Sequence, residues 1–255
     1  MADTQSKIAL ITGASRGLGR STALAAAARG IDVIFTYRSN RAEADKVVAD
    51  IKALGRTAIA FQLDTGDTVS FPAFAEKIAL ALRETFGRTN FDYLVNNAGH
   101  SAPGPIASLN EEDFDGLYRV HLKGVVFLTQ KLLPLIADGG RIVNLSSGLA
   151  RFSLPGYAAY ASMKGAIEVF TRYLAKELGP RGIAANVVAP GAIETDFGGG
   201  AVRDNAELNK FVASVTAMGR VGVPDDIGPM IATLLADENR WLTGQRIEVS
   251  GGMFL

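Results

Sequence analysis

Short apolar runs alternate along the chain with longer segments in which apolar residues recur at helical spacing. The runs are rich in β-branched and aliphatic residues and nearly continuous, as expected of strands buried on both faces. They lie at 7–12, 32–37, 57–63, 92–98, 140–147, 182–189 and 246–250. The helical segments between them include 18–30, 42–55, 71–87, 114–133 and 157–179. This alternation predicts an α/β fold, a doubly wound parallel sheet of about seven strands flanked by helices.

No linker rich in proline, serine or glycine divides the chain, so residues 1–255 are expected to form a single domain. The chain is 48% hydrophobic, and its 26 basic residues balance 26 acidic ones without a basic cluster. This balance argues against a nucleic acid or a membrane as partner. The first ten residues lack the pattern of a secretory leader, and no apolar stretch approaches the length of a membrane span. A cytoplasmic location is therefore expected.

The chain offers few side chains for metal or thiol chemistry. It contains no cysteine and two histidines, His100 and His121. Disulfides, thiolate nucleophiles and cysteine-based zinc sites are excluded, and no metal site is predicted. Any chemistry must use hydroxyls, carboxylates, lysines or a bound cofactor.

A glycine-rich turn, TGASRGLG at 12–19, follows the first strand and leads into a helix. Glycines at such a turn let a pyrophosphate approach the backbone amides of a helix N-terminus. The lysine of a nucleotide triphosphate loop is absent, which favours a dinucleotide. The turn therefore predicts a Rossmann-type dinucleotide site, although an ordinary strand-to-helix loop has the same appearance.

The end of the second strand bears on which dinucleotide binds. An acidic side chain there commonly accepts the ribose 2′-hydroxyl of NAD, whereas an arginine accommodates the 2′-phosphate of NADP. This strand ends in Tyr37 and Arg38, and the glycine turn adds Arg16. Guanidinium groups bind phosphate well, so NADP(H) is favoured over NAD(H). The alternative is that both arginines are ordinary surface residues.

Tyr160 and Lys164 lie four residues apart in a helical segment, so their side chains share one helix face. A free tyrosine has a pKa of about 10, and a nearby cation stabilises the phenolate and lowers that pKa. The pair can therefore act as a general acid or base. Pairs at this spacing are common on amphipathic helices, so the pair alone predicts little.

Four motifs in order resemble the short-chain dehydrogenase/reductase family. They are TGASRGLG, NNAG at 96–99, a serine thirteen residues before the tyrosine, and YASMK at 160–164. The segment 189–197 and the tail from 219 are also similar to that family, so the resemblance spans nearly the whole chain. It implies that Tyr160 exchanges a proton with a carbonyl or alcohol oxygen, that Ser147 polarises this oxygen, and that Lys164 lowers the pKa of Tyr160 and holds the nicotinamide ribose.

The resemblance also implies a set of cofactor contacts, all near the carboxyl ends of strands. Besides Tyr160 and Lys164 they are Gly13, Ser15, Arg16, Gly17, Leu18, Gly19, Tyr37, Arg38, Asp64, Asn96, Ala98, Gly99, Pro190, Gly191, Ile193 and Thr195. Asp64 is expected at the adenine, and Asn96 with Gly99 at the ribose. Tyr157 is expected to pack or to line the substrate pocket, and Ser146 to serve the strand end.

The chain departs from the family at His121, where an asparagine usually orders a water that relays protons to the lysine. His121 is a candidate catalytic residue. One interpretation is a neutral histidine that replaces the asparagine sterically and hydrogen-bonds the backbone. A second is that His121 joins the relay and titrates near neutral pH. A third is weakened catalysis. His100, beside the NNAG turn, is expected on a surface loop, with an orientation toward the active site as the alternative.

The predicted function is NADP(H)-dependent transfer of a hydride to a carbonyl carbon, or the reverse reaction, with Tyr160 as acid or base. The alternatives are an NAD-dependent alcohol dehydrogenase, a non-catalytic NADP-binding sensor or scaffold, and another enzyme class on the same fold, such as an epimerase or dehydratase. Residues 193–218 are expected to form a substrate lid. Leu149, Phe152 and Leu154 suggest a partly apolar pocket for a small-molecule carbonyl or alcohol. By analogy with the family, a homotetramer or dimer is expected.

Overall fold

The computed structural model describes residues 6–255, so part of the segment examined for a leader lies outside the described residues. Seven strands form one sheet in the order β3-β2-β1-β4-β5-β6-β7, and each neighbouring pair is parallel. The strands are β1 (Ile8–Ile11), β2 (Asp32–Tyr37), β3 (Ala58–Gln62), β4 (Phe91–Asn96), β5 (Ile136–Leu145), β6 (Ala184–Pro190) and β7 (Arg246–Val249). The predicted fold class and strand number are confirmed.

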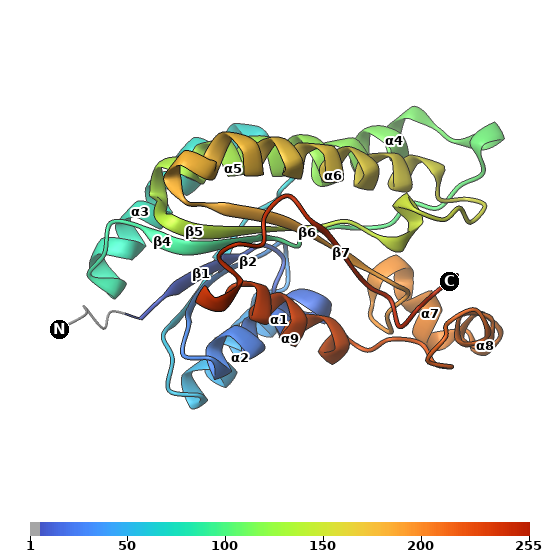
Figure 1. Ribbon diagram of the computed structural model, residues 1–255, viewed down its shortest axis with the longest axis horizontal. Helices are drawn as coiled ribbons and strands as arrows, with labels where there is room; N and C mark the ends of the chain where they lie inside the picture. Colours follow the sequence, from blue (N-terminus) through green and yellow to red (C-terminus); the bar gives the residue numbers. More distant parts are fainter. Residues whose placement is uncertain (1–5) are drawn as a thin grey trace.

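Helices cover both faces of the sheet (Figure 1). The long helices are α1 (Gly17–Ala28), α2 (Arg41–Ala53), α3 (Phe71–Phe86), α5 (Gly124–Leu132), α6 (Ala158–Leu178) and α9 (Pro224–Leu234). Helices α1, α2 and α9 lie on one face, and α3, α5 and α6 on the other. Successive residues of a strand point to opposite faces, so Ala9 and Ile11 join the first core while Ile8 and Leu10 join the second. Burial on both faces explains why the strands are continuously apolar.

The predicted helix at 114–133 is interrupted. The chain forms α4 (Glu111–Tyr118), a π-helical turn at Arg119–Lys123, and then α5. The π turn contains His121, whose ring is buried and bonded outside the helix. A π turn holds one residue more than an α-helical turn, and the outward bonding of the His121 ring is compatible with this extra residue. Such turns are frequent at functional sites.

The sheet reverses its direction of growth between β1 and β4. The chain builds β2 and β3 on one side of β1 and returns to place β4 on the other. In open parallel sheets, ligands bind in the crevice that this reversal leaves beyond the carboxyl ends of the strands. Two further helices, α7 (Ala201–Asp204) and α8 (Ala206–Ser214), lie beyond one end of the sheet near the C-terminus (Figure 1).

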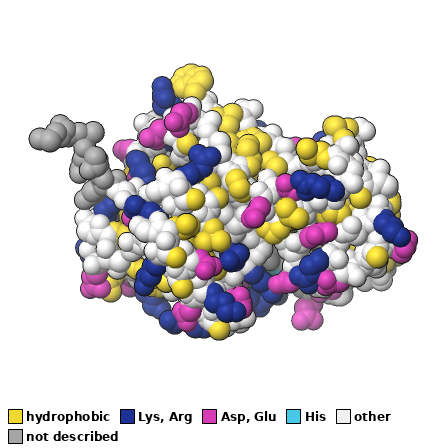
Figure 2. All heavy atoms as spheres, turned by 90° about the horizontal axis from the view of Figure 1, so that it is seen from below, with side chains coloured by type: hydrophobic (Ala, Val, Ile, Leu, Met, Phe, Trp, Pro, Cys, Tyr) yellow, Lys and Arg dark blue, Asp and Glu magenta, His cyan; other side chains and the backbone are white. Residues whose placement is uncertain are grey.

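No helix within residues 6–255 is both long enough and apolar enough to cross a membrane. On the face shown in Figure 2, basic and acidic side chains are interspersed, with apolar side chains scattered between them. That face therefore lacks the continuous basic surface that would follow a phosphate backbone.

Candidate functional site

The glycine turn brings the end of β1 against the end of β4. Thr12 Oγ1 accepts hydrogen bonds from the amides of Asn97 and Ala98, both at 3.0 Å. Gly13 has φ +66°, and a Cβ there would lie 2.9 Å from Ala98 Cα. Only glycine fits this position.

Helix α1 starts immediately after this turn. Its N-cap residue, Arg16, makes no capping side-chain hydrogen bond. The first amides of the helix therefore remain available to an anion. The glycine turn and these amides together fit a dinucleotide phosphate. Ser15 and Leu18 are half-buried in the same turn, and Gly19 is buried.

Both candidate phosphate-binding arginines are exposed and paired with carboxylates. Arg38 Nε lies 3.2 Å from Asp64 Oδ2, and Arg16 Nη1 lies 3.4 Å from Asp196 Oδ2. No acid was expected beside Arg38, because the sequence argument considered the end of β2 alone. Asp64 follows β3, which runs parallel beside β2, so the two strand ends meet. Tyr37 is buried beneath them.

Asn96 is oriented differently from the prediction. Its side chain is buried, and Nδ2 donates to Thr129 Oγ1 at 3.0 Å and to Asn144 Oδ1 at 2.9 Å. It therefore ties β4 to α5 and β5 and does not project toward a ribose. The next residue, Asn97, was not among the predicted site residues, yet its Nδ2 donates to the carbonyls of Thr12 and Gly13 at 2.8 and 3.1 Å. Asn97 is the second asparagine of the NNAG motif, and this position in the motif could have identified it as a site residue.

Three predicted catalytic side chains converge at the end of β5 and the start of α6. Lys164 Nζ donates to the carbonyl of Leu145 at 2.8 Å and lies 5.4 Å from the centre of the Tyr160 ring. Ser147 lies at the same corner, and its Oγ accepts a hydrogen bond from the amide of Leu149 at 3.2 Å. Tyr160 and Lys164 are both buried. Helical spacing and the end of one strand thus assemble a phenol, an ammonium and a hydroxyl.

Burial dominates the proton affinities of this group. It raises the pKa of Tyr160 above its ordinary value, and the Ser147 hydroxyl offsets part of that rise. Burial also lowers the pKa of Lys164 to about 7. The expected lowering of the pKa of Tyr160 by Lys164 is therefore not found in the free protein. Burial disfavours the charged form of each side chain, so Tyr160 is a neutral phenol while Lys164 is partly protonated near neutral pH.

His121 is 1% exposed and belongs to the same cluster. Its Nε2 lies 2.7 Å from the carbonyl oxygen of His100 and 3.2 Å from the amide of the same residue. Its ring meets that of Tyr160 edge-on, with the centres 5.2 Å apart. Burial, followed by the charge of Lys164, holds the pKa of His121 well below its usual range. These contacts are the ones that the neutral, backbone-bonded interpretation expects.

Gly99 and His100 complete this corner of the site. A Cβ on Gly99 would lie 2.6 Å from His121 Cε1, so the glycine makes room for the ring. His100 is half-buried, with its ring centre 5.4 Å from that of His121. His100 thus lies on a loop but is only partly exposed, and its backbone faces the buried ring of His121.

Replacing His121 with asparagine is expected to leave the midpoint of the pH–rate profile unchanged over about pH 6 to 8, because a neutral histidine does not titrate there. The measurement is kcat/KM for carbonyl reduction against pH, with His100→Asn as the control. A midpoint that moves in the His121 variant alone would contradict this expectation.

The segment after β6 returns to the glycine turn. Pro190 ends β6, and the Gly191 amide donates to the carbonyl of Val249 at 3.1 Å. Ile193 forms an isolated bridge with Gly222. The methyl group of Thr195 lies 3.6 Å from the position of a Cβ on Gly17. Pro190, Gly191, Ile193 and Thr195 thus follow one strand, and Thr195 reaches the cofactor turn.

The apolar surroundings of Tyr160 differ in part from the prediction. Leu149 packs in the cluster that contains Tyr160. Phe152 and Leu154 join another cluster, and Phe152 contacts Phe254 with ring centres 4.7 Å apart. Phe197, which the sequence argument did not single out, lies 5.8 Å from Tyr160 between ring centres. It belongs to the segment predicted to be a lid.

The whole chain is similar in sequence and fold to known reductases. A family model described as enoyl-(acyl carrier protein) reductase matches residues 13–254. Versicolorin reductase of Emericella nidulans is 35% identical over 258 residues, covering 97% of this chain and 96% of its own. Among solved structures, the reductase LugOII, which catalyses keto-reduction at C1 in lugdunomycin biosynthesis, has a TM-score of 0.93 at 38% identity over 98% of this chain and 99% of its own. The angucycline C-6 ketoreductase LanV, solved with bound NADP, has a TM-score of 0.93 at 34% identity over 98% of this chain and 96% of its own.

Proposed function

Because the chain belongs to the short-chain dehydrogenase/reductase family, we propose that it is an NADPH-dependent ketoreductase with Tyr160 as the general acid. Its relatives are reductases, and the chain is an oxidoreductase that acts on carbonyl or CH–OH groups. The observation that carries the proposal is the pair of buried side chains Tyr160 and Lys164 beside the half-buried Ser147 at the carboxyl end of the sheet.

The roles of the three side chains follow from their chemistry. Bound NADPH supplies the hydride. Tyr160 is a protonated phenol at neutral pH, since its pKa is raised, and this is the form that can donate a proton to a ketone oxygen. The Ser147 hydroxyl accepts from the amide of Leu149, so its own hydrogen is free to bond the same ketone oxygen. Lys164 is held at the carbonyl of Leu145, where it can bond a ribose and replace the proton lost by the phenol.

The preference for NADPH is supported by the two arginines at the mouth of the cofactor crevice and by the NADP bound to LanV. The residues proposed to hold the cofactor are those predicted from the sequence, except that the Asn96 side chain lies inside the fold and Asn97 shapes the glycine turn. The pairing of Arg38 with Asp64 implies that a 2′-phosphate would compete with that carboxylate for the guanidinium.

Changing Arg38 to aspartate is expected to weaken NADPH binding by roughly 10- to 100-fold and to affect NADH binding little. The basis is the loss of about 1.5–3 kcal/mol in a hydrogen bond between charged groups. Titration with each nucleotide, followed by nicotinamide fluorescence, measures both affinities.

Arg20→Asp provides the control, since Arg20 is another exposed arginine paired with a carboxylate. Equal losses for NADPH and NADH in the Arg38 variant would contradict the NADP assignment. Preference of the wild type for NADH would favour the alternative of an NAD-dependent alcohol dehydrogenase. Binding of NADPH without turnover of any carbonyl compound would favour a sensor or scaffold.

The proposed substrate class is a ketone on or beside a fused aromatic ring. The aromatic ring of Phe197 and the apolar Leu149 beside Tyr160 support this class, as do the names of the hydroxynaphthalene reductase-like and angucycline relatives. A direct test compares 1-tetralone, 2-tetralone and cyclohexanone as substrates with NADPH. A crotonyl thioester belongs in the same panel, because the family description names an enoyl reductase.

Several finer predictions accompany this proposal. Residues 193–218 act as a lid over the substrate, with Phe197 facing the tyrosine. The chain is one catalytic domain, assembles as a homotetramer or dimer, and works in the cytoplasm. Mass measurement in solution tests the assembly, and a monomer would count against it.

A further inference from the structure

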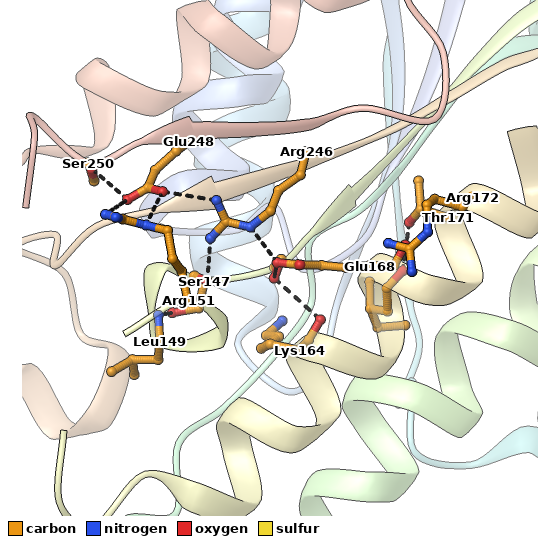
Figure 3. A network of polar contacts seen from close by, with 12 residues as sticks. Ser147, Leu149, Arg151, Lys164, Glu168, Thr171, Arg172, Arg246, Glu248 and Ser250 are labelled. Atoms are coloured by element: carbon orange, nitrogen blue, oxygen red, sulfur yellow. Dashed lines mark hydrogen bonds and ion pairs between the residues drawn. The ribbon is translucent and has the colours of Figure 1, made fainter. Parts of the chain in front are cut away.

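Arg246, on β7, uses all three of its guanidinium nitrogens within the fold (Figure 3). Nε donates to Glu168 Oε1 at 2.7 Å, and Nη1 donates to Glu248 Oε2 at 2.9 Å. Nη2 donates to the backbone carbonyl of Ser147 at 3.3 Å. The three acceptors come from α6, β7 and the segment after β5. One planar side chain therefore links the last strand to the peptide of the proposed catalytic serine.

Glu168 lies one helical turn after Lys164 on α6. It accepts a hydrogen bond from the Ser146 hydroxyl at 2.6 Å, in addition to the one from Arg246. Ser146 Oγ also lies 3.3 Å from the backbone carbonyl of Lys164. The carboxylate thus connects the residue before Ser147 with the helix that carries Tyr160 and Lys164.

The same network holds the far end of the 146–151 segment. Arg151 Nη2 donates to Glu248 Oε1 at 2.8 Å and to the carbonyl of Met253 at 3.0 Å. Glu248 Oε1 also accepts from the Ser250 hydroxyl at 3.0 Å. Two carboxylates and two guanidinium groups balance in charge and fasten both ends of one short segment.

We propose that Glu168 and Arg246 are positioning residues, which set the backbone at Ser147 against Tyr160 and Lys164 without touching the reacting atoms. The inference rests on the proposed function. It extends the site to a layer that the YASMK motif and the preceding serine do not include, since Arg246 lies 99 positions after Ser147.

The chemistry of the network indicates that it orients the backbone at Ser147 and does not mainly add to the stability of the fold. Partly buried ion pairs are often no more stabilising than apolar residues of similar size, although removing one partner alone is costly. Three acceptors in three directions also require the planar fork of arginine, because a lysine has one nitrogen and cannot reach all of them. The main effect of the network is therefore to fix the position of the Ser147 backbone, and its effect on the local charge is secondary.

The test compares Arg246→Met with Arg56→Met. Arg56 pairs with Asp32 at 2.8 Å, and their side chains are 24% and 10% exposed, close to the 23% and 16% of the pair formed by Arg246 and Glu168. Asp32 begins β2, so this control pair lies at the amino end of the sheet, away from the site.

Both methionine variants are expected to lose stability toward urea, Arg246→Met somewhat more because it removes ion pairs to two carboxylates and Arg56→Met removes one. Only Arg246→Met is expected to lower kcat for ketone reduction, by roughly 10- to 100-fold, since a misplacement near 1 Å can cost about 100-fold. NADPH affinity and KM are expected to stay unchanged. In Arg246→Lys, kcat should be lowered almost as much as in Arg246→Met, because lysine cannot reach all three acceptors. Glu168→Gln, which keeps an acceptor oxygen, should lose less activity than Glu168→Leu.

Hydrogen exchange in the segment 146–151 gives a readout that needs no activity. It is expected to accelerate in Arg246→Met and Glu168→Leu and to stay unchanged in Arg56→Met. Equal kinetic losses in the two arginine variants, or unchanged exchange at 146–151 in Arg246→Met, would overturn the inference. A wild type that reduces no carbonyl compound would overturn the proposed function, while the exchange comparison would still test the positioning of the backbone at Ser147.

Discussion

Replacing Tyr160 with phenylalanine is expected to lower kcat for ketone reduction by roughly 100- to 10,000-fold, the usual contribution of a general acid. The phenol is buried beside Ser147, and its raised pKa keeps it protonated at neutral pH. Phenylalanine keeps the ring that packs against His121 and Phe197 and removes only the proton donor. The measurement is single-turnover reduction of a tetralone under saturating NADPH, with NADPH affinity measured separately and expected to be unchanged.

Tyr157→Phe is the matched control, because it makes the same chemical change three residues earlier, at the N-cap of α6. We expect it to keep most of the activity. If the Tyr157 variant were inactive and the Tyr160 variant active, the proton donor would be Tyr157 and the proposed arrangement would be wrong. Loss of activity in both variants with normal NADPH binding would place the two phenols in one hydrogen-bonded chain.

Replacing Gly228 with valine is expected to reduce the free energy of unfolding by about 3 kcal/mol, at the upper end of the usual cost of overpacking. A Cβ at Gly228 would lie 2.3 Å from Ser21 Oγ and 2.5 Å from the backbone carbon of Ser21. The obstacle includes the backbone of α1, so no rotamer change relieves it. Helices α1 and α9 would have to separate, and urea denaturation measures the cost.

Gly165→Ala is the control for this prediction. Gly165 lies within α6, and no atom beyond its helical neighbours lies within 4 Å of its Cβ position. Alanine there is expected to raise stability by roughly 0.5–1 kcal/mol through helix propensity. Should Gly228→Val be as stable as the wild type, the close approach of α1 and α9 would not be a requirement of this fold.

Local pattern was sufficient to predict the sheet, because each strand is a continuous apolar run that owes its burial to helices on both faces. It was also sufficient to bring Tyr160 and Lys164 together, since helical spacing alone places them on one face. The glycine turn was predictable for the same reason: positive φ and close backbone approach leave few other residues for Gly13.

The remainder depended on contacts between distant elements. Asp64 meets Arg38 because two strands lie side by side, and the end of one strand does not reveal its neighbour. The raised pKa of Tyr160 depended on the depth of burial, which outweighs the hydrogen bonding of Ser147. Arg246 lies 99 positions after Ser147 in the chain, so no sequence motif around either residue predicts their contact.

The side chain of Asn96 belongs to a polar chain that crosses an otherwise apolar layer. It bonds Thr129 of α5 and Asn144 of β5, and Asn144 Nδ2 donates in turn to Thr171 of α6 at 2.9 Å. Apolar surfaces slide over one another at little cost, whereas these bonds are satisfied in a single alignment. For anyone diversifying this scaffold by mutation, the four positions therefore behave as one: a library that varies them singly will return mostly unpaired buried amides, and useful sequences will be reached by changing the whole set at once.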